Sequence, residues 1–365
     1  MASISSLLWF VLPALLSAIF VLALIGPARH IDLVDHPVGR KNHSVPTPLV
    51  GGIAIFLSLI LTHWLAGELP SQSSSLMIAL LVTVGIGLAD DAHEIGHRSK
   101  FFAQLIAALV IVSGTEVHVA HLGDIFALGD VVLDKWSYLV TVIAIIGLMN
   151  AINMIDGLDG LAGTQVLIPL LMFVGVAHAA GDAASALDLM ILAGAISGFL
   201  LFNVRSPWRK HALVFMGDTG GLLLGLLLAW YSIRLAGKDV SPLRPITAVW
   251  ILAVPLLDMG SVMFLRMIQH KSPFTADRQH LHYILRDAGF SVSQVVGVMA
   301  FLSVALSLFA LFADAHSVPE AAMFAGFVVL LLGYLALLVN SGVVTRLACR
   351  LLCSSGKEKA PDSAG

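Results

Sequence analysis

The stretch LLWFVLPALLSAIFVLALI, residues 7–25, decides the class of fold that this chain can adopt. It carries no charged side chain, and its length is close to the ~20 apolar residues that a helix needs to cross the hydrocarbon core of a bilayer. Comparable runs occupy residues 294–312 and 321–339. Several runs of this kind in one chain indicate a polytopic membrane protein.

The composition of the whole chain supports the same class. Apolar residues make up 58% of the 365 residues and charged residues only 12%, with a mean hydropathy of +0.94. A soluble domain carries about 25% charged residues, so most of this chain cannot form water-facing surface. The net charge of −3 and the absence of a basic, aromatic-rich stripe give no indication of nucleic-acid binding. Cys349 and Cys353 form a single pair, which we interpret as ordinary thiols.

Hydropathy predicts an all-α bundle of eleven transmembrane helices in one domain, residues 1–353, followed by a flexible tail at 354–365. No Lys or Arg precedes the first span, so that span is not expected to be a cleaved signal peptide. Residues 117–136 alternate and turn at two glycines, which predicts a small periplasmic β-hairpin. The predicted spans are 6–26, 49–67, 73–89, 101–119, 138–152, 162–180, 186–203, 219–236, 245–269, 293–313 and 320–341.

The distribution of charges among the loops predicts the orientation. With the N-terminus in the periplasm and the C-terminus in the cytoplasm, sixteen of the 20 Lys and Arg residues lie inside. The acidic residues divide 10 outside and 13 inside, so the bias belongs to Lys and Arg, as the positive-inside rule requires. The basic residues left outside are Lys135, Arg234, Lys238 and Arg244.

Five segments on the predicted inner side hold most of the unusual polar residues. The first is DHPVGRKNHSVPTPLVGG, residues 35–52, where Arg40, Lys41 and His43 lie among prolines that prevent a helix. An anion-binding site and an ordinary basic inner loop explain this segment equally well.

The second segment contains Asp90 and Asp91. They end a span with fourteen clearly apolar residues, which is ~21 Å of helix, whereas the hydrocarbon core is ~30 Å thick. Both carboxylates are therefore expected in a cavity, where a metal or a cationic group must neutralise them. A helix end that reaches water is the alternative, but acids are unfavourable at a helix C-terminus. Lys100 begins the next span and is expected to return to the same pocket.

The third segment, NAINMIDGLDGLAG at residues 150–163, is the strongest motif. Asn150, Asn153, Asp156 and Asp159 recur at every third position and would lie along one side of a helix, which the neighbouring glycines would loosen into a loop. Amide and carboxylate oxygens in this arrangement can ligate a hard cation or hydrogen-bond to a sugar or a base.

The fourth segment, FNVRSPWRKHALVFMGDTGG at residues 202–221, places Asp218 at the start of a span. A helix N-terminus favours an anion there, although an N-cap role is the simpler explanation of Asp218 alone.

The fifth segment, SPFTADRQHLHYIL at residues 272–285, contains two histidines two positions apart. His280 and His282 converge only if the backbone is extended or turned. Arg278 beside them favours phosphate binding, and two His without Cys argue against zinc. Asp258 and Arg266, on the ninth span, are interpreted as a structural pair.

In order from Asp35 to Tyr283, these segments resemble the polyprenyl-phosphate N-acetylhexosamine-1-phosphate transferases, the group that contains MraY and WecA. The eleven spans and the short loop ending DRQHLHYIL resemble the WecA type. The resemblance implies transfer of GlcNAc-1-phosphate from UDP-GlcNAc to undecaprenyl phosphate, with release of UMP. It also implies a Mg²⁺ or Mn²⁺ cofactor, a bacterial inner membrane with the active site facing the cytoplasm, and the start of a lipid-linked surface polysaccharide such as O-antigen or common antigen. A homodimer is compatible with it.

The resemblance also implies roles for individual residues. Asp218 matches the firmest metal ligand, and Asn153 matches a second one. Lys100 matches a phosphate-holding lysine, Asn203 and Phe215 match contacts to uracil, and the histidine loop matches a cover over the diphosphate and the sugar. The implied catalytic residues are Asp90, Asp91, Asp156 and Asp159. The full set of predicted substrate-binding residues is Arg40, Lys41, His43, Lys100, Asn150, Asn203, Phe215, Arg278, His280 and His282.

Two departures from the family pattern leave the sugar open. Gly221 stands where many relatives have Ser, and Tyr283 stands where bacterial relatives often have another His. UDP-GalNAc, UDP-FucNAc and the MurNAc-pentapeptide donor therefore remain alternatives. A lipid or sugar transporter is the second class considered. Transporter sites usually lie at the bilayer midplane between repeats, whereas this chain has its acids at helix ends and no visible internal repeat.

Overall fold

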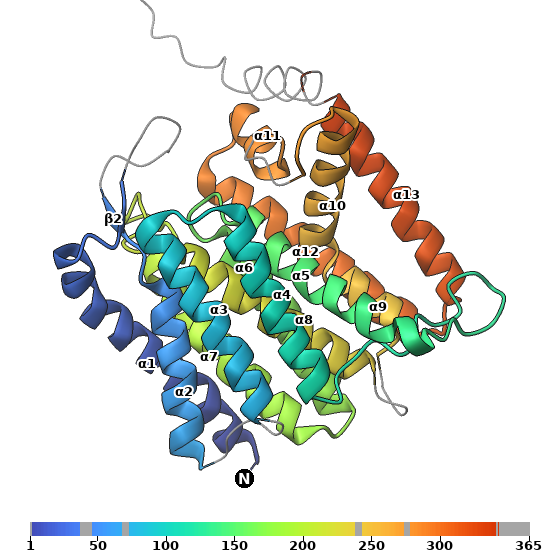
Figure 1. Cartoon of the computed structure of the whole chain (residues 1–365), viewed down its shortest axis with the longest axis horizontal. Coiled ribbons are helices and arrows are strands. Elements are labelled where there is room, and N and C mark those ends of the chain that lie inside the picture. Colours follow the sequence, from blue (N-terminus) through green and yellow to red (C-terminus); the bar gives the residue numbers. More distant parts are fainter. Residues whose placement is uncertain are drawn as a thin grey trace, which may run out of the picture.

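The computed structural model describes residues 2–36, 46–67, 73–237, 243–273, 278–340 and 342. Long helices dominate these ranges, with one short antiparallel sheet of two strands (Figure 1). The elements are α1 Ala2–His30, β1 Val34–Asp35, β2 Thr47–Pro48, α2 Gly51–Ala66, α3 Ser73–His93, α4 His97–Gly114, η1 Asp134–Trp136, α5 Ser137–Ile155, α6 Leu161–Ala179, α7 Ala183–Asn203, α8 Gly217–Ala236, α9 Pro245–Ile251, α10 Ala253–Ile268, α11 Leu281–Asp287, α12 Val292–Ala315 and α13 Glu320–Val339.

Within the described part of the chain, eight helices are long and apolar enough to cross a membrane. They are α1, α3, α5, α6, α7, α8, α12 and α13, and the bent pair α9 and α10 makes a ninth if it counts as one span. Helix α2 is apolar but has only 16 residues, and α4 is not in this set. The prediction of a helical, multi-pass membrane protein is confirmed. The count of eleven spans stays a prediction, because α2 and α4 are not among the eight.

The ninth predicted span is not one continuous helix. Helices α9 and α10 meet at an angle of 82° around Leu252. Pro255 explains the break, because proline has no N–H to donate to the carbonyl four residues earlier. That carbonyl, on Ile251, instead accepts a hydrogen bond from Oγ of Ser307 on α12 at 3.3 Å. The hydroxyl of α12 thus replaces the missing backbone donor.

Helix α8 is the centre of the bundle, with 89% of its most apolar stretch buried in the protein. Such an all-round apolar helix needs other helices on every side, and α2, α3 and α5 supply them. At two glycines, α2 and α3 approach the backbone of α8 directly. A Cβ on Gly52 of α2 would overlap the backbone of Gly220, and one on Gly87 of α3 would overlap Cα of Thr219. Small residues at such crossings let helices approach closely in a membrane.

The first turn of α8 lies at the same end of the bundle as the sheet. The N–H groups of Gly51 and Gly52 donate to the carbonyls of Phe215 and Met216 at 2.9 and 3.0 Å, which joins the segment after β2 to the residues that precede α8. Figure 1 shows β2 and α11 at this end and the N-terminus at the opposite end. We call the end with β2 and α11 the site end.

The predicted hairpin at residues 117–136 forms as a turned loop without named strands. One antiparallel bridge joins His121 and Val132, and the N–H of Leu122 donates to the carbonyl of Val131 at 3.0 Å. The named strands, β1 and β2, lie instead between α1 and α2 and pair Val34 with Pro48. Hydropathy did not predict this sheet because its strands have two residues each.

The backbone contact between α3 and α8 predicts a large difference between two glycines of α3. Gly87→Ala places a Cβ against the backbone of Thr219, which cannot yield as a side chain does, whereas a Cβ on Gly85 meets no atom within 4 Å. Overpacking of this kind costs about 1–3 kcal/mol, so Gly87→Ala should lower the melting temperature of the detergent-purified protein. Gly85→Ala is the matched control, with an unchanged or higher melting temperature. Equal melting temperatures for the two variants would contradict this packing.

Candidate active site

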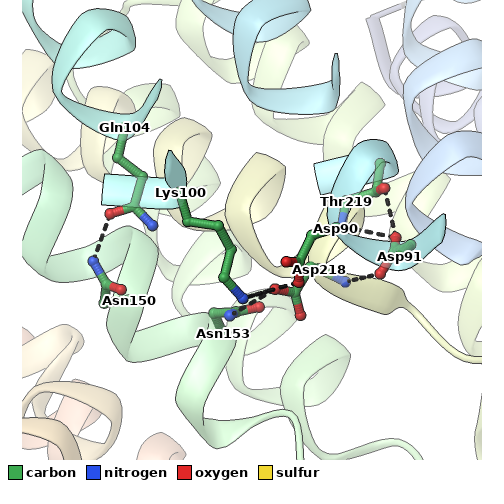
Figure 2. A network of polar contacts seen from close by, with 8 residues as sticks. All are labelled: Asp90, Asp91, Lys100, Gln104, Asn150, Asn153, Asp218 and Thr219. Atoms are coloured by element: carbon green, nitrogen blue, oxygen red, sulfur yellow. Dashed lines mark hydrogen bonds and ion pairs between the residues drawn. The ribbon is translucent and has the colours of Figure 1, made fainter. Parts of the chain in front are cut away.

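Asp91, in the last turn of α3, caps the N-terminus of α8. Its Oδ1 accepts a hydrogen bond from the N–H of Asp218 at 2.7 Å, and its Oδ2 accepts from the N–H and the hydroxyl of Thr219 at 3.1 and 2.6 Å (Figure 2). The first N–H groups of a helix have no partner within the helix and carry partial positive charge. Both oxygens of Asp91 are therefore used in holding the first turn of α8.

Gly217 makes this capping possible. Its φ is +71°, which favours glycine, and a Cβ there would lie 2.5 Å from Oδ2 of Asp91. The motif around Asp218 was predicted to mark a helix start, and it does. Its own side chain is not the cap, because Asp91 takes that role from a helix distant in sequence. Thr219 was missed, although a hydroxyl beside a glycine at a helix start is a signal that could have found it.

Lys100, in the first turn of α4, joins two carboxylates. Its Nζ donates to Oδ2 of Asp90 at 2.9 Å and to Oδ2 of Asp218 at 2.5 Å (Figure 2). All three side chains are largely buried, with exposed fractions of 19% for Lys100, 12% for Asp90 and 26% for Asp218. The prediction that Lys100 returns to the pocket of Asp90 is confirmed. Oδ1 of Asp90 is buried and has no hydrogen-bond partner among the described residues.

The two asparagines of α5 face different partners. The amide nitrogen of Asn153 lies 3.5 Å from Oδ2 of Asp218. Asn150, one turn further into the bundle, donates instead to Oε1 of Gln104 on α4 and to the carbonyl of Ile146, each at 2.8 Å. The structure therefore brings Asn153 to the carboxylate cluster, and it places Asn150 in a contact between α4 and α5. Gln104 was not predicted, because a single amide within an apolar helix gives no recognisable spacing.

The two aspartates of the same motif lie outside α5, because the helix ends at Ile155. Asp156 is its C-cap, and among the described residues no hydrogen bond to its carboxylate is found. Burial, followed by the negative charges of Asp218, Asp91 and Asp159, raises the pKa of Asp156 to about 7. The carboxylate of Asp159 is paired: it accepts from Nε of Arg205 at 2.6 Å and from the N–H of Ala212 at 3.1 Å.

Asn203 and Phe215 hold the loops around this motif. Oδ1 of Asn203 accepts from the N–H of Gly160 at 2.8 Å, and its Nδ2 donates to the carbonyl of Val214 at 2.9 Å. Asn203 is only 4% exposed. Through these two hydrogen bonds, its amide joins the backbone at Gly160 to the backbone at Val214. Phe215, which is half-buried, pairs through its backbone with Pro48 and Gly51.

The two histidines of the fifth segment converge, although only His280 has extended backbone and His282 lies in the first turn of α11. His280 has φ −70° and ψ 151° as the N-cap of α11, and the rings of His280 and His282 stack with centroids 5.6 Å apart. Both histidine side chains are buried. Arg278 is exposed, and its Nη2 lies 3.4 Å from Oδ1 of Asp287. A Cβ on Gly157 would overlap Nε2 of His282, so this ring lies directly beside the loop that carries Asp156.

Asp258 and Arg266 were predicted to be a structural pair, and both contact His280. Asp258 accepts from Nδ1 of His280 at 2.7 Å, and Arg266 donates to its Nε2 at 3.4 Å. The three predicted residues Arg40, Lys41 and His43 lie outside the described residues.

Oxygen donors dominate the cluster at the start of α8. Among the described residues, Asp90, Asp91, Asp156 and Asp218 carry four carboxylates here against the ammonium of Lys100, which leaves an excess of negative charge for a cation to offset. No group of three or more His, Cys, Asp or Glu side chains suited to holding a metal ion occurs among the described residues. This donor set suits a hard cation that also takes ligands from a substrate, as Mg²⁺ does.

Comparison with known proteins gives a consistent result. Residues 73–236 match the model of glycosyl transferase family 4. The chain is 32% identical to the undecaprenyl-phosphate alpha-N-acetylglucosaminyl 1-phosphate transferase of Haemophilus influenzae over 340 residues, which is 92% of this chain and 95% of the relative. It is 30% identical to the proteins of the same name from Escherichia coli O157:H7 and Yersinia pestis over 310 residues, 84% of this chain and 84% and 85% of those relatives.

The carboxylate of Asp156, which has no hydrogen-bond partner in the described part of the chain, predicts a pH-dependent effect on stability. A pKa raised to about 7, from an ordinary value near 3.9, means that ionisation destabilises the fold progressively from about pH 4 to pH 7. Asp156→Asn cannot ionise, so it should raise the melting temperature at pH 8 and change it much less at pH 4. Thermal unfolding with a metal chelator present measures this.

Asp159→Asn is the matched control, because it weakens the acceptor of Arg205 and Ala212 and should lower the melting temperature. The prediction fails if Asp156→Asn also melts below wild type at pH 8.

Proposed function

Because the chain belongs to the polyprenyl-phosphate N-acetylhexosamine-1-phosphate transferase family, we propose that it transfers GlcNAc-1-phosphate from UDP-GlcNAc to undecaprenyl phosphate and releases UMP. The observation that carries this proposal is the meeting of Asp90, Lys100, Asn153 and Asp218 at the first turn of α8. These residues come from four helices within the range that matches glycosyl transferase family 4. The lipid-linked product would start a surface polysaccharide.

The reaction requires two anions to approach one another. An oxygen of the lipid phosphate attacks the phosphorus that bears the sugar, a new P–O bond forms, and the bond to the phosphate of UMP breaks with its electron pair leaving on UMP. Catalysis of such a step depends on positioning and on neutralising negative charge. The ammonium of Lys100 supplies positive charge at the centre of the cluster, and it can exchange one carboxylate partner for a phosphate oxygen.

The geometry distinguishes the two adjacent aspartates of α3. Asp91 uses both oxygens on the first turn of α8, whereas Oδ1 of Asp90 is buried without a partner among the described residues. We therefore assign to Asp90 the acceptance of any proton that remains on the lipid phosphate, whose second pKa is near 6. Asp91 has a positioning role, because it fixes the backbone that carries Asp218.

A divalent cation fits this cluster through Asp218 and Asn153. Mg²⁺ is usually held by one or two carboxylates together with substrate phosphates, so a cage of three acidic side chains is not required. Asn153 now turns its nitrogen toward Asp218, and ligation by its oxygen requires a half-turn of the amide, which needs little space. When bound, the cation neutralises charge on the diphosphate of the donor.

The donor would lie between this cluster and the histidine loop. His282 lies against Gly157, next to Asp156, and Asn203 orders the backbone around Gly160 and Val214. We assign the sugar diphosphate to this region and the uracil to the neighbourhood of Phe215. UDP-GalNAc, UDP-FucNAc and the MurNAc-pentapeptide donor are the alternatives for the same site.

A donor panel tests the proposed reaction. Purified protein in detergent should convert undecaprenyl phosphate and UDP-GlcNAc into a lipid-linked product and UMP, both detected by mass spectrometry, in a Mg²⁺-dependent manner. Asp218→Asn should lower turnover at least about a hundredfold, because an amide lacks the charge that holds a hard cation.

Asp130→Asn is the matched control, since Asp130 lies in the 117–136 loop, paired with His121 and half-exposed. Turnover only with another UDP-sugar would replace the proposed donor. Full activity of Asp218→Asn at low Mg²⁺ would remove Asp218 from the metal site.

We further propose that the site end faces the cytoplasm of a bacterial inner membrane, with eleven crossings, a periplasmic N-terminus and a cytoplasmic C-terminus. The excess of Lys and Arg on this side supports the orientation. Reporter fusions after residues 70, 130 and 182 should report a periplasmic location, and fusions after 210 and 280 a cytoplasmic one. The reverse pattern would place the site away from cytoplasmic UDP-sugars and would contradict both proposals.

A further inference from the structure

Asp258 lies at the centre of a buried polar network that joins three helices. Its Oδ1 accepts from the N–H of Leu281 at 3.0 Å and from the hydroxyl of Tyr334 on α13, and its Oδ2 accepts from Nδ1 of His280 at 2.7 Å. Asp258 is only 2% exposed. A buried carboxylate with three donors is held in its ionised form. Asp258 therefore acts only as an acceptor, and each of its three partners donates to it.

These contacts determine the protonation of His280. Its Nε2 faces Nη2 of Arg266 at 3.4 Å, and a guanidinium can only donate. Nε2 must therefore be the bare nitrogen, and the ring must carry its proton on Nδ1, which donates to Asp258. His280 is thus the neutral Nδ1–H tautomer, with its donor and its lone pair both used. It has no atom left for a phosphate or for proton transfer.

His282 is the opposite case. It is fully buried, and neither ring nitrogen has a hydrogen-bond partner among the described residues. Burial lowers the pKa of His282 to about 4, so the ring is neutral and offers one N–H donor and one acceptor. Leaving both unpaired in a buried place is costly, which indicates that a ligand supplies the partners. The ring lies beside Gly157, next to Asp156.

Apolar packing supports the same arrangement. Val262 and Leu265 of α10, Ile284 of α11 and Leu338 of α13 form a separate small core next to this network. Tyr334 packs against that core while its hydroxyl reaches Asp258. Helix α13 is otherwise little buried, with 11% of its most apolar stretch inside the protein. Tyr334 thus joins α13 to the network through Asp258 and through this small core.

We propose that Asp258, Arg266 and Tyr334 are positioning residues that lock His280 as the neutral Nδ1–H tautomer, and that His280 in turn presents His282, stacked on it, to the diphosphate of the donor. His280 makes no contact with substrate, and His282 is the residue of the pair that does. The identity of the ligand rests on the proposed function. The tautomer of His280 and the slow hydrogen exchange expected for residues 278–290 do not.

The tautomer is tested without any activity measurement. Protein labelled with ¹⁵N-histidine should show the nitrogen shifts of a neutral Nδ1–H ring that disappear in His280→Gln. Asp258→Ala removes both oxygens of this carboxylate, and with them the acceptor of Nδ1–H, so hydrogen exchange over residues 278–290 should become at least about tenfold faster. Tyr334→Phe, which removes one hydroxyl, should show a smaller increase, and Tyr138→Phe in α5 is the matched control without an increase. An imidazolium or an Nε2–H ring at His280 would overturn the proposal.

Kinetics separate the two histidines. His280→Ala should lower kcat about a hundredfold, because it removes the ring that Asp258 and Arg266 hold and on which His282 stacks. His280→Asn keeps a donor near the place of Nδ1 and should stay within about tenfold of wild type. His282→Asn and His282→Ala should both lose about a hundredfold or more, since neither restores both ring nitrogens. If His280→Asn is as inactive as His280→Ala while its hydrogen exchange stays slow, His280 contacts substrate and the proposal is wrong.

The same experiments distinguish failure of the proposed function. If wild-type protein forms no lipid-linked product from any UDP-sugar while the Nδ1–H tautomer and the exchange pattern are as expected, then the reaction is wrong and the locked histidine stands.

Discussion

The capping of one helix by a carboxylate of another is the interaction on which the rest of the site depends. Asp91 accepts from the N–H groups of Asp218 and Thr219 in the first turn of α8, and in doing so it fixes the position of Asp218 relative to α3. Lys100 and Asn153 reach Asp218 only because that residue is held there. The backbone contacts of α8 with Gly52 and Gly87 bring the helices close enough for this capping. The contacts that pack α8 against α2 and α3 therefore also position Asp218, so a methyl group added at Gly52 or Gly87 would disturb both the packing and the site.

Electrostatics divides the site end into two parts. At the start of α8, carboxylates outnumber the ammonium of Lys100 among the described residues. In the histidine network, every charge is offset inside the protein, since Asp258 is paired through His280 with Arg266. In the first part, Lys100 can exchange a carboxylate for a phosphate oxygen of a substrate. In the second part, the hydrogen bonds of His280 leave no free polar atom for such an exchange. His282 lies at the boundary, because it stacks on the fixed part and faces the changing one.

Sequence patterns predicted the positions of the helices and the convergence of Lys100 with Asp90, because hydropathy and spacing along a chain suffice for both. The roles of Asp91 and His280 were not predictable in this way. Asp91 lies 127 residues from the N–H that it caps, and His280 lies 22 residues from Asp258, so only the folded arrangement shows that their polar atoms are used up. The break between α9 and α10 is an intermediate case. Pro255 was visible in the sequence. The hydroxyl of Ser307, which donates to the carbonyl of Ile251 that the proline leaves without its helical donor, comes from another helix and could not be predicted.

The separation of Asp91 from its partners has a consequence for how the protein is made. Asp90 meets Lys100 after ten more residues, so that pair can form as soon as the helical hairpin of α3 and α4 leaves the ribosome. Asp91 must wait for a further 127 residues, which takes roughly ten seconds at ~5–20 residues per second. During that interval the carboxylate of Asp91 has neither of its partners on α8. The cluster around Asp218 can therefore be completed only after α8 has been synthesised, late relative to the hairpin of α3 and α4.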